Sequence, residues 1–396
     1  MKPIKIIGGK VITRDGHENI TVVIANGKID YVGSQPIEMP EDSTTIDAKG
    51  AWISAGFIDL HTHGAGGADF MDGTVEAYES ALKMHAAHGT TLLYPTTLSS
   101  TTESLYLAIE QYRKAKQANI EGAAMGGLHL EGPYFAYEQR GAQDERHLRN
   151  PQKQEYMALL EAGKGDIARW SLAPELDGAA EMATELRKAG ILMAMGHTAA
   201  TFEECQKAHR AGFTHMTHFY SCMSTITRRN AYRYAGVIEY GYYNDDITIE
   251  IIGDGIHVPA SLLNLVYKIK GAENIALITD SMRAAGMPDG KYLLGSMEQG
   301  QEVVVEDGVA KLLDRSAFAG SVATMDRVVR TVRDMTQRPL PEIIRSATET
   351  PARIMGLANR KGSIEKGYDA DIVIFDDDIN VRTTIVDSKI VYNNNI

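Results

Sequence analysis

The feature that most constrains the fold is a repeated alternation of short apolar runs with longer amphipathic segments through the middle of the chain. The apolar runs are at 56–60, 91–95, 123–130, 169–172, 191–195, 214–217, 247–252 and 275–279. The amphipathic segments have apolar residues at helical spacing and lie at 74–88, 103–119, 152–162, 179–189, 202–211 and 260–270. Strands that alternate with helices predict an α/β protein. Eight such units over about 290 residues match a (β/α)8 barrel, although a doubly wound open sheet has the same local pattern.

The two ends of the chain differ from its middle. Short β-branched runs fill about the first 55 residues, and Asn26-Gly27 between two of them is a strong signal for a two-residue hairpin. Near the other end, Ile372–Phe375 is expected to be a strand and Val381–Val391 a second hairpin. The sequence therefore predicts a small β-sandwich domain of residues 1–55 plus 357–396, beside a barrel domain of residues 56–356.

Charge and composition exclude several classes of protein. The 396 residues include 40 Lys and Arg against 52 Asp and Glu, a net charge of −12, whereas nucleic-acid binding relies on clustered cations. We find no run of about 18 apolar residues and no signal-peptide core. Cys205 and Cys222 are the only cysteines, too few for a disulfide framework. We therefore expect a cytoplasmic protein that acts on a small molecule and binds neither nucleic acid nor membrane.

Histidines and acids stand at the carboxyl ends of five of the eight predicted strands. They are His61 and His63, Glu131, His197, His218, and Asp280. The carboxyl ends of barrel strands meet at one face, where barrel enzymes place their active sites. Imidazole suits zinc and iron, and carboxylate oxygen also binds zinc. Each residue alone also fits a structural role, but five strands that end in this way predict a metal-dependent hydrolase.

Alternation along the strands extends this prediction to neighbouring residues. His215 and His218 differ in parity, so only one is expected to point inward. His218 is the better candidate ligand, and His215 is expected to be an outward or structural histidine. His129 and Asp59 lie one layer deeper than the ligands, and we expect them to orient those ligands.

The chemistry of such a site suits amide hydrolysis. A divalent metal lowers the pKa of bound water toward about 7 and polarises the carbonyl under attack. Asp280 would take the proton from the water and return it to the leaving amine. Amide hydrolysis needs both actions, because the nitrogen must leave as a neutral amine.

The chain resembles the amidohydrolase superfamily and, within it, the N-acetylglucosamine-6-phosphate deacetylase family. The matching segments run in the family's order across nearly the whole chain: GFIDLHTHG, LHLEGPYF, RGAQ, MGHTAAT, THFYSCM, GDGIHV, LITDSMRAAG, FAGSVATM and GSIEKGYDADIVIFD. The resemblance implies a (β/α)8 barrel with a β-sandwich built from both termini. This is the architecture that the strand pattern also predicts.

The resemblance also implies roles for the strand-end residues. Glu131, His197 and His218 match the family's core metal ligands. His61 and His63 match a pair that holds a second metal in some members. The resemblance therefore allows one or two divalent ions, which could be zinc, iron or manganese. Glu131 would bridge two ions, and Asp280 matches the catalytic acid/base.

Further matches concern the substrate. Gln143 falls where members carry Gln or His near the substrate, and the segment Phe318-Ala319-Gly320 falls where the family covers the acetyl group. His257 matches a residue that reaches the sugar phosphate in the neighbouring subunit's site. The resemblance therefore implies a homodimer.

The departures from the family pattern fall on the sugar-phosphate side. Ser221 and Cys222 stand where members carry Asn-Ala in contact with the substrate, and Cys222 is expected to be a bystander thiol rather than a nucleophile. Arg228 and Arg229 precede Asn230, where members have one Arg followed by a Pro-Gly turn. Either arginine could clamp a phosphate with two hydrogen bonds.

The implied reaction is the conversion of N-acetylglucosamine-6-phosphate to glucosamine-6-phosphate and acetate. The departures leave open a different N-acyl amino sugar, such as the galactosamine epimer or an unphosphorylated substrate. A non-catalytic barrel that binds a sugar or a protein is the remaining alternative. The full set of ligands and the acid/base argue against it.

Overall fold

Parallel strands from the middle of the chain form a barrel in the computed structural model, which describes residues 2–13 and 16–394. The barrel strands are β8 (Phe57–Thr62), β11 (Thr90–Pro95), β13 (Leu128–Glu131), β14 (Ile167–Leu172), β15 (Leu192–Met195), β16 (Phe213–Met216), β19 (Thr248–Ile252) and β20 (Ile275–Ile278). Every predicted apolar run forms one of them. Parallel bridges between Thr96 and His129 and between Thr62 and Ser281 join the two strand groups into a closed ring. The structure therefore confirms the predicted barrel and excludes the alternative, a doubly wound open sheet.

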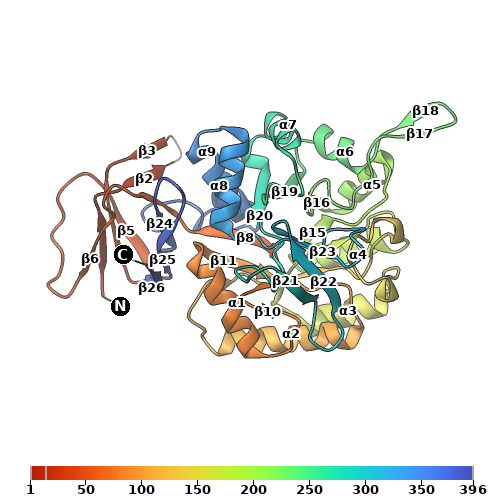
Figure 1. The fold of residues 1–396 in the computed structure, drawn as a ribbon, viewed down its shortest axis with the longest axis horizontal. Helices are drawn as coiled ribbons and strands as arrows, with labels where there is room; N and C mark the ends of the chain where they lie inside the picture. Colours follow the sequence, from red (N-terminus) through yellow and green to blue (C-terminus); the bar gives the residue numbers. More distant parts are fainter. Residues whose placement is uncertain (1, 14–15, 395–396) are drawn as a thin grey trace.

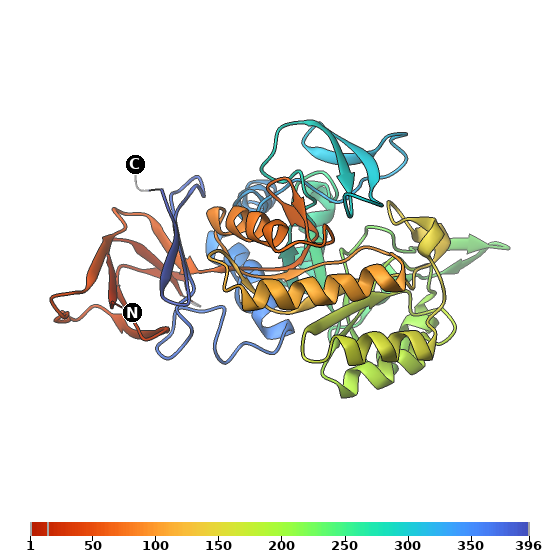
Figure 2. The same cartoon turned by 90° about the horizontal axis from the view of Figure 1, so that it is seen from below.

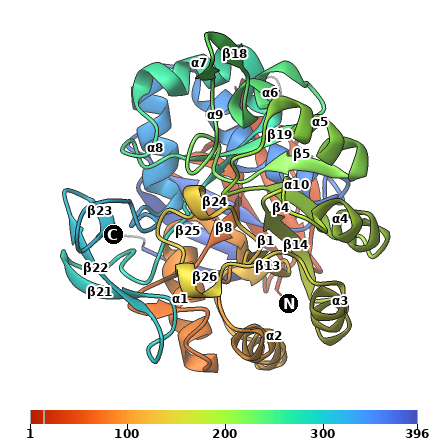
Figure 3. The same cartoon turned by 90° about the vertical axis from the view of Figure 1, so that its right-hand side faces the viewer.

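Helices surround the barrel, as the view in Figure 3 shows. The predicted ones are α1 (Val75–Ala87), α2 (Thr102–Gln117), α3 (Lys153–Ala162), α4 (Ala179–Lys188), α5 (Phe202–Ala211) and α7 (Ala260–Lys270). The sequence patterns did not predict α6 (Val237–Tyr243), α8 (Met325–Thr336), α9 (Leu340–Ala347) and α10 (Glu349–Ile354). These elements complete the outer layer beside the last barrel strands.

Helix α5 shows how local sequence fixes an element next to the site. Its N-cap, Thr201, accepts a hydrogen bond from the backbone N–H of Glu204, whose side chain accepts one from the backbone N–H of Thr201. This reciprocal capping box satisfies N–H groups that a helix start leaves unpaired. Gly212 ends the helix at φ 116°, a left-handed conformation that costs glycine little. The helix begins shortly after His197 and ends just before β16.

Strands from both termini form two further sheets, which lie together at one end of the molecule (Figure 2). One sheet has the order β5-β4-β1-β6 and the other the order β26-β25-β24-β7-β2-β3. The strands are β1 (Ile4–Ile7), β2 (Lys10–Thr13), β3 (Gly16–Glu18), β4 (Thr21–Ala25), β5 (Lys28–Gly33), β6 (Thr44–Asp47), β7 (Trp52–Ala55), β24 (Ile372–Phe375), β25 (Val381–Val386) and β26 (Lys389–Asn393). Both sheets contribute isoleucines, such as Ile6, Ile24 and Ile374, to one buried cluster. The predicted β-sandwich from both termini is confirmed.

Four smaller groups of paired strands extend the barrel. A sheet of β21 (Gly290–Leu294), β22 (Gln301–Glu306) and β23 (Val309–Leu312) follows the last barrel strand. The hairpin of β17 (Thr227–Arg229) and β18 (Tyr232–Tyr234) projects from the molecule (Figure 1). The short pairs β9 (Gly64–Ala65) with β10 (Ala68–Asp69) and β12 (Ala124–Met125) with β11 lie beside the barrel strands.

Candidate active site

Three of the candidate site residues share one backbone feature. His197, His218 and Asp280 each lie two residues beyond the end of a barrel strand, and their φ angles are 46°, 31° and 48°. Positive φ is uncommon for residues other than glycine, and such conformations gather at functional sites. The chain therefore turns sharply after β15, β16 and β20, and all three side chains are buried at the same end of the barrel.

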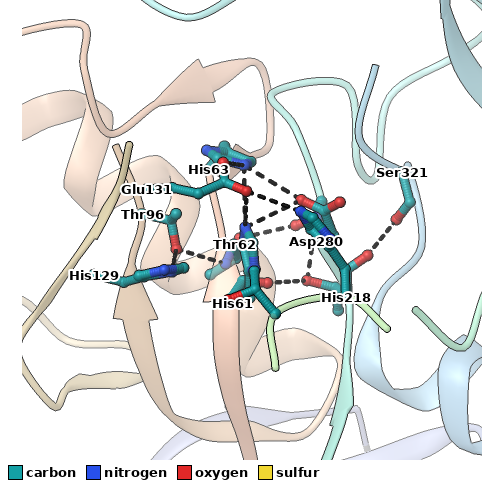
Figure 4. Close-up of polar contacts among 12 residues, drawn as sticks. His61, Thr62, His63, Thr96, His129, Glu131, His218, Asp280 and Ser321 are labelled. Carbon is teal, nitrogen blue, oxygen red and sulfur yellow. Dashed lines mark hydrogen bonds and ion pairs between the residues drawn. The ribbon is translucent and has the colours of Figure 1, made fainter. Parts of the chain in front are cut away.

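The first cluster consists of His61, His63 and Asp280. The Nε2 atoms of the two histidines lie 3.4 Å apart. Asp280 Oδ1 lies 3.4 Å from Nε2 of His61 and 3.3 Å from Nε2 of His63. Figure 4 shows these side chains converging from β8 and from the loop after β20. One oxygen and two ring nitrogens therefore face a common point.

The second cluster consists of Glu131, His197 and His218. Glu131 Oε1 lies 3.2 Å from Nε2 of His197 and 3.0 Å from Nε2 of His218, and the two nitrogens are 3.2 Å apart. The other oxygen of Glu131, Oε2, lies 3.5 Å from Nε2 of His63. Oε1 of Glu131 also lies 3.6 Å from Nε2 of His61. Glu131 thus stands between the clusters, and both of its oxygens approach the first cluster while Oε1 also contacts the second.

Both clusters fit divalent metal ions. The Nδ1 atom of His197 donates to the carbonyl oxygen of Gln139 at 2.8 Å, and Nδ1 of His61 donates to Oε2 of Glu250 at 3.2 Å. With Nδ1 engaged in this way, Nε2 is left as the atom of each ring that can bind a cation, and both Nε2 atoms point into the clusters. Zinc–nitrogen bonds of about 2.0–2.1 Å in tetrahedral geometry place ligand atoms about 3.4 Å apart, close to the separations here.

The electrostatics of the clusters favour added positive charge. Burial alone lowers the pKa of His61, but the charges of Asp280 and Glu131 outweigh it and raise that pKa to about 10. Burial alone raises the pKa of Glu131, but His61 and the other ligand imidazoles hold that pKa well below its usual value. The pKa of Asp280 is likewise lowered by His61 and His63 against the effect of burial. Both carboxylates are therefore ionised at neutral pH.

The layer beneath the ligands ties the barrel strands together. Asp59 accepts hydrogen bonds from the backbone N–H of His61 at 3.3 Å and from the hydroxyl of Thr279 at 2.6 Å. The His129 ring packs edge-on against the His61 ring, with centroids 4.6 Å apart, and bonds to Thr96 and Ser171. Figure 4 shows His129 and Thr96 next to His61.

His215 differs from the sequence prediction. Its Nε2 donates to Glu250 Oε1 at 3.2 Å inside the barrel, so an outward direction is wrong and a structural role stands. The parity argument failed because β16 ends at Met216, and the turn at His218 breaks the alternation. His215 and His218 therefore both reach the barrel interior.

Two charged residues at the centre of the barrel were missed. Glu250 on β19 and Arg169 on β14 are fully buried and form an ion pair. Both lie inside runs that count as apolar strands, where nothing in the local pattern marks a charged residue as functional. The presence of one acid and one base within predicted barrel strands could have indicated this ion pair, because buried charges need partners.

A cavity of about 260 Å³ opens onto the clusters. Its walls include both clusters except His61, which is fully buried beneath them. Among the residues predicted to contact the substrate, the lining includes Gln143, Ser221, Cys222, His257 and Phe318. Gln143 Nε2 donates to Glu131 Oε2 at 2.7 Å. Ala319 lies outside the lining, buried in the apolar cluster around β22 and β23.

The structure also places the residues that the resemblance associates with the sugar phosphate. His257 lines the cavity of its own chain, its ring 4.7 Å from that of Phe318, and its Nδ1 pairs with Asp254 at 2.7 Å. The resemblance had implied a reach into a neighbouring subunit. Arg228 and Arg229 are exposed on the projecting β17–β18 hairpin and do not line this cavity.

A closed parallel barrel with two buried histidine–carboxylate clusters at the carboxyl ends of its strands defines the class of metal-dependent barrel hydrolases. The chain belongs to the amidohydrolase family, whose model matches residues 52–391. It is thus a metal-dependent amidohydrolase. Along the described residues, no helix is both long and apolar enough to cross a membrane.

The similar proteins include deacetylases of amino-sugar phosphates. The N-acetylglucosamine-6-phosphate deacetylase of Bacillus subtilis is 32% identical over 99% of this chain and 96% of its own length. The N-acetylgalactosamine-6-phosphate deacetylase of Escherichia coli is 29% identical over 94% and 95%. A variant of the Mycobacterium smegmatis N-acetylglucosamine-6-phosphate deacetylase, solved with N-acetyl-D-glucosamine-6-phosphate, superposes with a TM-score of 0.88 at 30% identity, covering 99% of both chains.

Proposed function

We propose that this enzyme hydrolyses N-acetylglucosamine-6-phosphate to glucosamine-6-phosphate and acetate. The observation that carries the proposal is the convergence of both ligand clusters and Asp280 on one cavity of about 260 Å³. That volume is near the lower end for small-molecule sites, of about 300–1,000 Å³. Full-length similarity to deacetylases of this substrate supports the same conclusion.

The chemistry divides between the bound ion and Asp280. A divalent cation held by these ligands supplies a more acidic water and a polarised acetamide carbonyl. Asp280 is ionised, buried and within 3.4 Å of two ligand nitrogens, so it is placed to accept a proton from the water. Asp280 then delivers that proton to the amide nitrogen as the C–N bond breaks. Acetate and the neutral amine are the products.

The cavity walls suggest how the sugar is oriented. Gln143 contacts Glu131 and is assigned to the acetamide side, and the segment Phe318-Ala319-Gly320 is assigned to cover the acetyl group. Ser221 and Cys222 follow His218 and are assigned to the hexose, together with His257. Cys222 takes part by shape, because the imidazole that its thiol contacts is that of His197, which belongs to the second cluster and is not assigned as a base.

Phosphate recognition is assigned to Arg228 or Arg229 within a homodimer. Neither arginine lines the cavity of its own chain, yet both are exposed on a projecting hairpin. A second copy of the chain could accept this hairpin at the mouth of its cavity, where an arginine can clamp a phosphate with two hydrogen bonds. Mixed dimers of an Arg228→Ala/Arg229→Ala variant with an Asp280→Asn variant then regain activity, whereas each variant alone is inactive.

A second candidate substrate is N-acetylgalactosamine-6-phosphate. The similarity to an enzyme of that name and the Ser221-Cys222 pair, in place of the family's Asn-Ala, favour it. Acetate release from both phosphorylated epimers and from unphosphorylated N-acetylglucosamine tests the assignment, after reconstitution with zinc, iron or manganese. The proposal expects the highest kcat/KM with N-acetylglucosamine-6-phosphate. A tenfold or greater preference for another member of the panel contradicts it.

The cellular setting follows from cysteine chemistry. Cys205 and Cys222 are both unpaired, as suits a reducing compartment. We therefore assign the reaction to the cytoplasm.

Zinc is the assigned metal, and iron and manganese are the alternatives. Reconstitution of the enzyme with each metal distinguishes them.

A further inference from the structure

A single buried carboxylate touches one member of each metal-ligand cluster. Glu250 Oε2 accepts a hydrogen bond from Nδ1 of His61 at 3.2 Å and another from the backbone N–H of His218 at 3.0 Å. His61 belongs to the first cluster and His218 to the second. We propose that Glu250 is a positioning residue that holds one ligand of each cluster and thereby sets the divalent-metal affinity of both. This inference rests on the metal chemistry of the proposed function.

The other oxygen of Glu250 is fully engaged as well. Its Oε1 accepts from Nε2 of His215 at 3.2 Å and forms the ion pair with Arg169. Arg169 also donates to the carbonyl oxygen of Leu60 on β8 at 2.9 Å. The carboxylate thus accepts from four donors and cannot rotate without breaking several bonds. All of these side chains are fully buried.

Each of the two bonds from Oε2 has a distinct effect on its ligand. The bond to Nδ1 of His61 fixes a proton on that nitrogen, which leaves Nε2 as the atom that can bind a cation, facing His63 and Asp280. The bond to the backbone N–H of His218 holds the sharp turn at this residue, where φ is 31°. That turn directs the His218 ring toward Glu131. Without Glu250, the His61 ring can rotate or change tautomer, and the His218 turn loses its anchor.

Charge balance explains why a carboxylate can serve here. Arg169 neutralises Glu250, so the pair adds no net charge to the site. The negative charge that attracts cations comes from Glu131 and Asp280. Glu250 therefore acts through geometry and not by direct ligation.

Zinc binding to the metal-stripped protein tests this without substrate. Competition with a chromophoric chelator gives the number of zinc ions and their dissociation constants. The wild type is expected to bind two ions, and Glu250→Gln, whose amide has one acceptor oxygen, is expected to weaken both by about 10- to 100-fold, as loss of such outer partners commonly does. Because no turnover is measured, failure of the proposed deacetylase activity does not affect this result.

Two further variants keep the test decisive. The double variant Glu250→Leu/Arg169→Met removes the acceptor and the opposing charge together, so no unpaired charge stays buried. It is expected to show the same weakening of zinc affinity at both clusters. Glu155→Gln is the matched control, because Glu155 is a partly buried carboxylate whose partners, Thr102, Tyr134 and Arg149, belong to neither cluster. It is expected to lower the melting temperature without changing zinc affinity. A single zinc ion in the wild type, loss at one cluster only, or unchanged affinities in both Glu250 variants would overturn the proposal.

Discussion

Asp280 and His61 are joined twice, once through the backbone and once through their side chains. The backbone N–H of Asp280 donates to the carbonyl oxygen of His61 at 2.9 Å, and Asp280 Oδ1 lies 3.4 Å from Nε2 of His61. Figure 4 shows the two side chains facing each other. The proposed proton acceptor and a proposed metal ligand are therefore held together by two contacts, although they come from the last and first barrel strands.

Replacement of Asp280 by asparagine tests its role in proton transfer. Asparagine tolerates the positive φ at this position and keeps one oxygen, but it cannot accept the proton. We expect kcat to fall by about 10²- to 10⁴-fold, the usual contribution of a general base, while the Glu131 cluster keeps its ion. Steady-state acetate release gives kcat. Asp307→Asn, at an exposed site with φ 54°, is the control, and an Asp280 variant within tenfold of wild type would refute the role.

Glu131 is expected to be needed for the binding of both metal ions, whereas His61 is expected to be needed for the binding of one. Glu131 lies within 3.6 Å of histidine nitrogens of both clusters, whereas His61 is a member only of the first. After dialysis, elemental analysis should therefore find both ions depleted in Glu131→Gln and one ion retained in His61→Ala. His209→Ala should keep the wild-type content, because the His209 ring on α5 bonds to Tyr240 and Asn244 and belongs to neither cluster. Equal metal content in the Glu131 and His61 variants would contradict this arrangement.

Alkylation distinguishes the two cysteines. Cys222 is partly exposed in the cavity, whereas Cys205 is fully buried on α5 and burial raises the pKa of its thiol. Iodoacetamide is therefore expected to modify Cys222 alone and to abolish activity in parallel, because the added group occupies the cavity. Mass spectrometry locates the modification. Cys205→Ala should stay as sensitive as wild type, and inactivation that persists in Cys222→Ala would be inconsistent with the cavity geometry.

Asp369 is expected to stabilise the fold above about pH 4. It pairs with Lys28 on β5 and with Arg360 and Lys361, and Lys28 and these C-terminal partners outweigh burial and lower its pKa from 3.8 to about 2. A depressed folded-state pKa contributes stability that is present above the unfolded pKa and lost as the pH falls through the folded one. Asp369→Asn should lower the free energy of unfolding by about 1–2 kcal/mol at pH 7.

The pH dependence separates this ion-pair effect from a packing effect. The difference between wild type and Asp369→Asn, measured by urea denaturation at each pH, should shrink between pH 4 and pH 2. A difference that stays constant over that range would show that the carboxylate's charge is not responsible.

The barrel and the clustering of the histidines and acids were predictable because both follow from repeated local patterns. Apolar runs gave the strands, and residues just after strand ends must meet at one face of a barrel. The Asn26-Gly27 turn was equally local: its φ angles of 52° and 80° are those that such a hairpin needs.

The central charge pair and the direction of His215 were not predicted, because they depend on contacts across the barrel. Glu250 and Arg169 meet only when β14 and β19 close into the same ring. The direction of His215 depended on where β16 ends, which alternation cannot locate. The distance of Arg228 and Arg229 from the cavity likewise depends on how an exposed hairpin projects.

The most direct test of the whole account is acetate release from N-acetylglucosamine-6-phosphate by metal-stripped enzyme before and after zinc is restored. The two clusters and Asp280 predict no measurable release without metal and full activity on addition of up to two equivalents of zinc. Release at the same rate by the metal-stripped protein, or none after zinc is bound, would contradict the account.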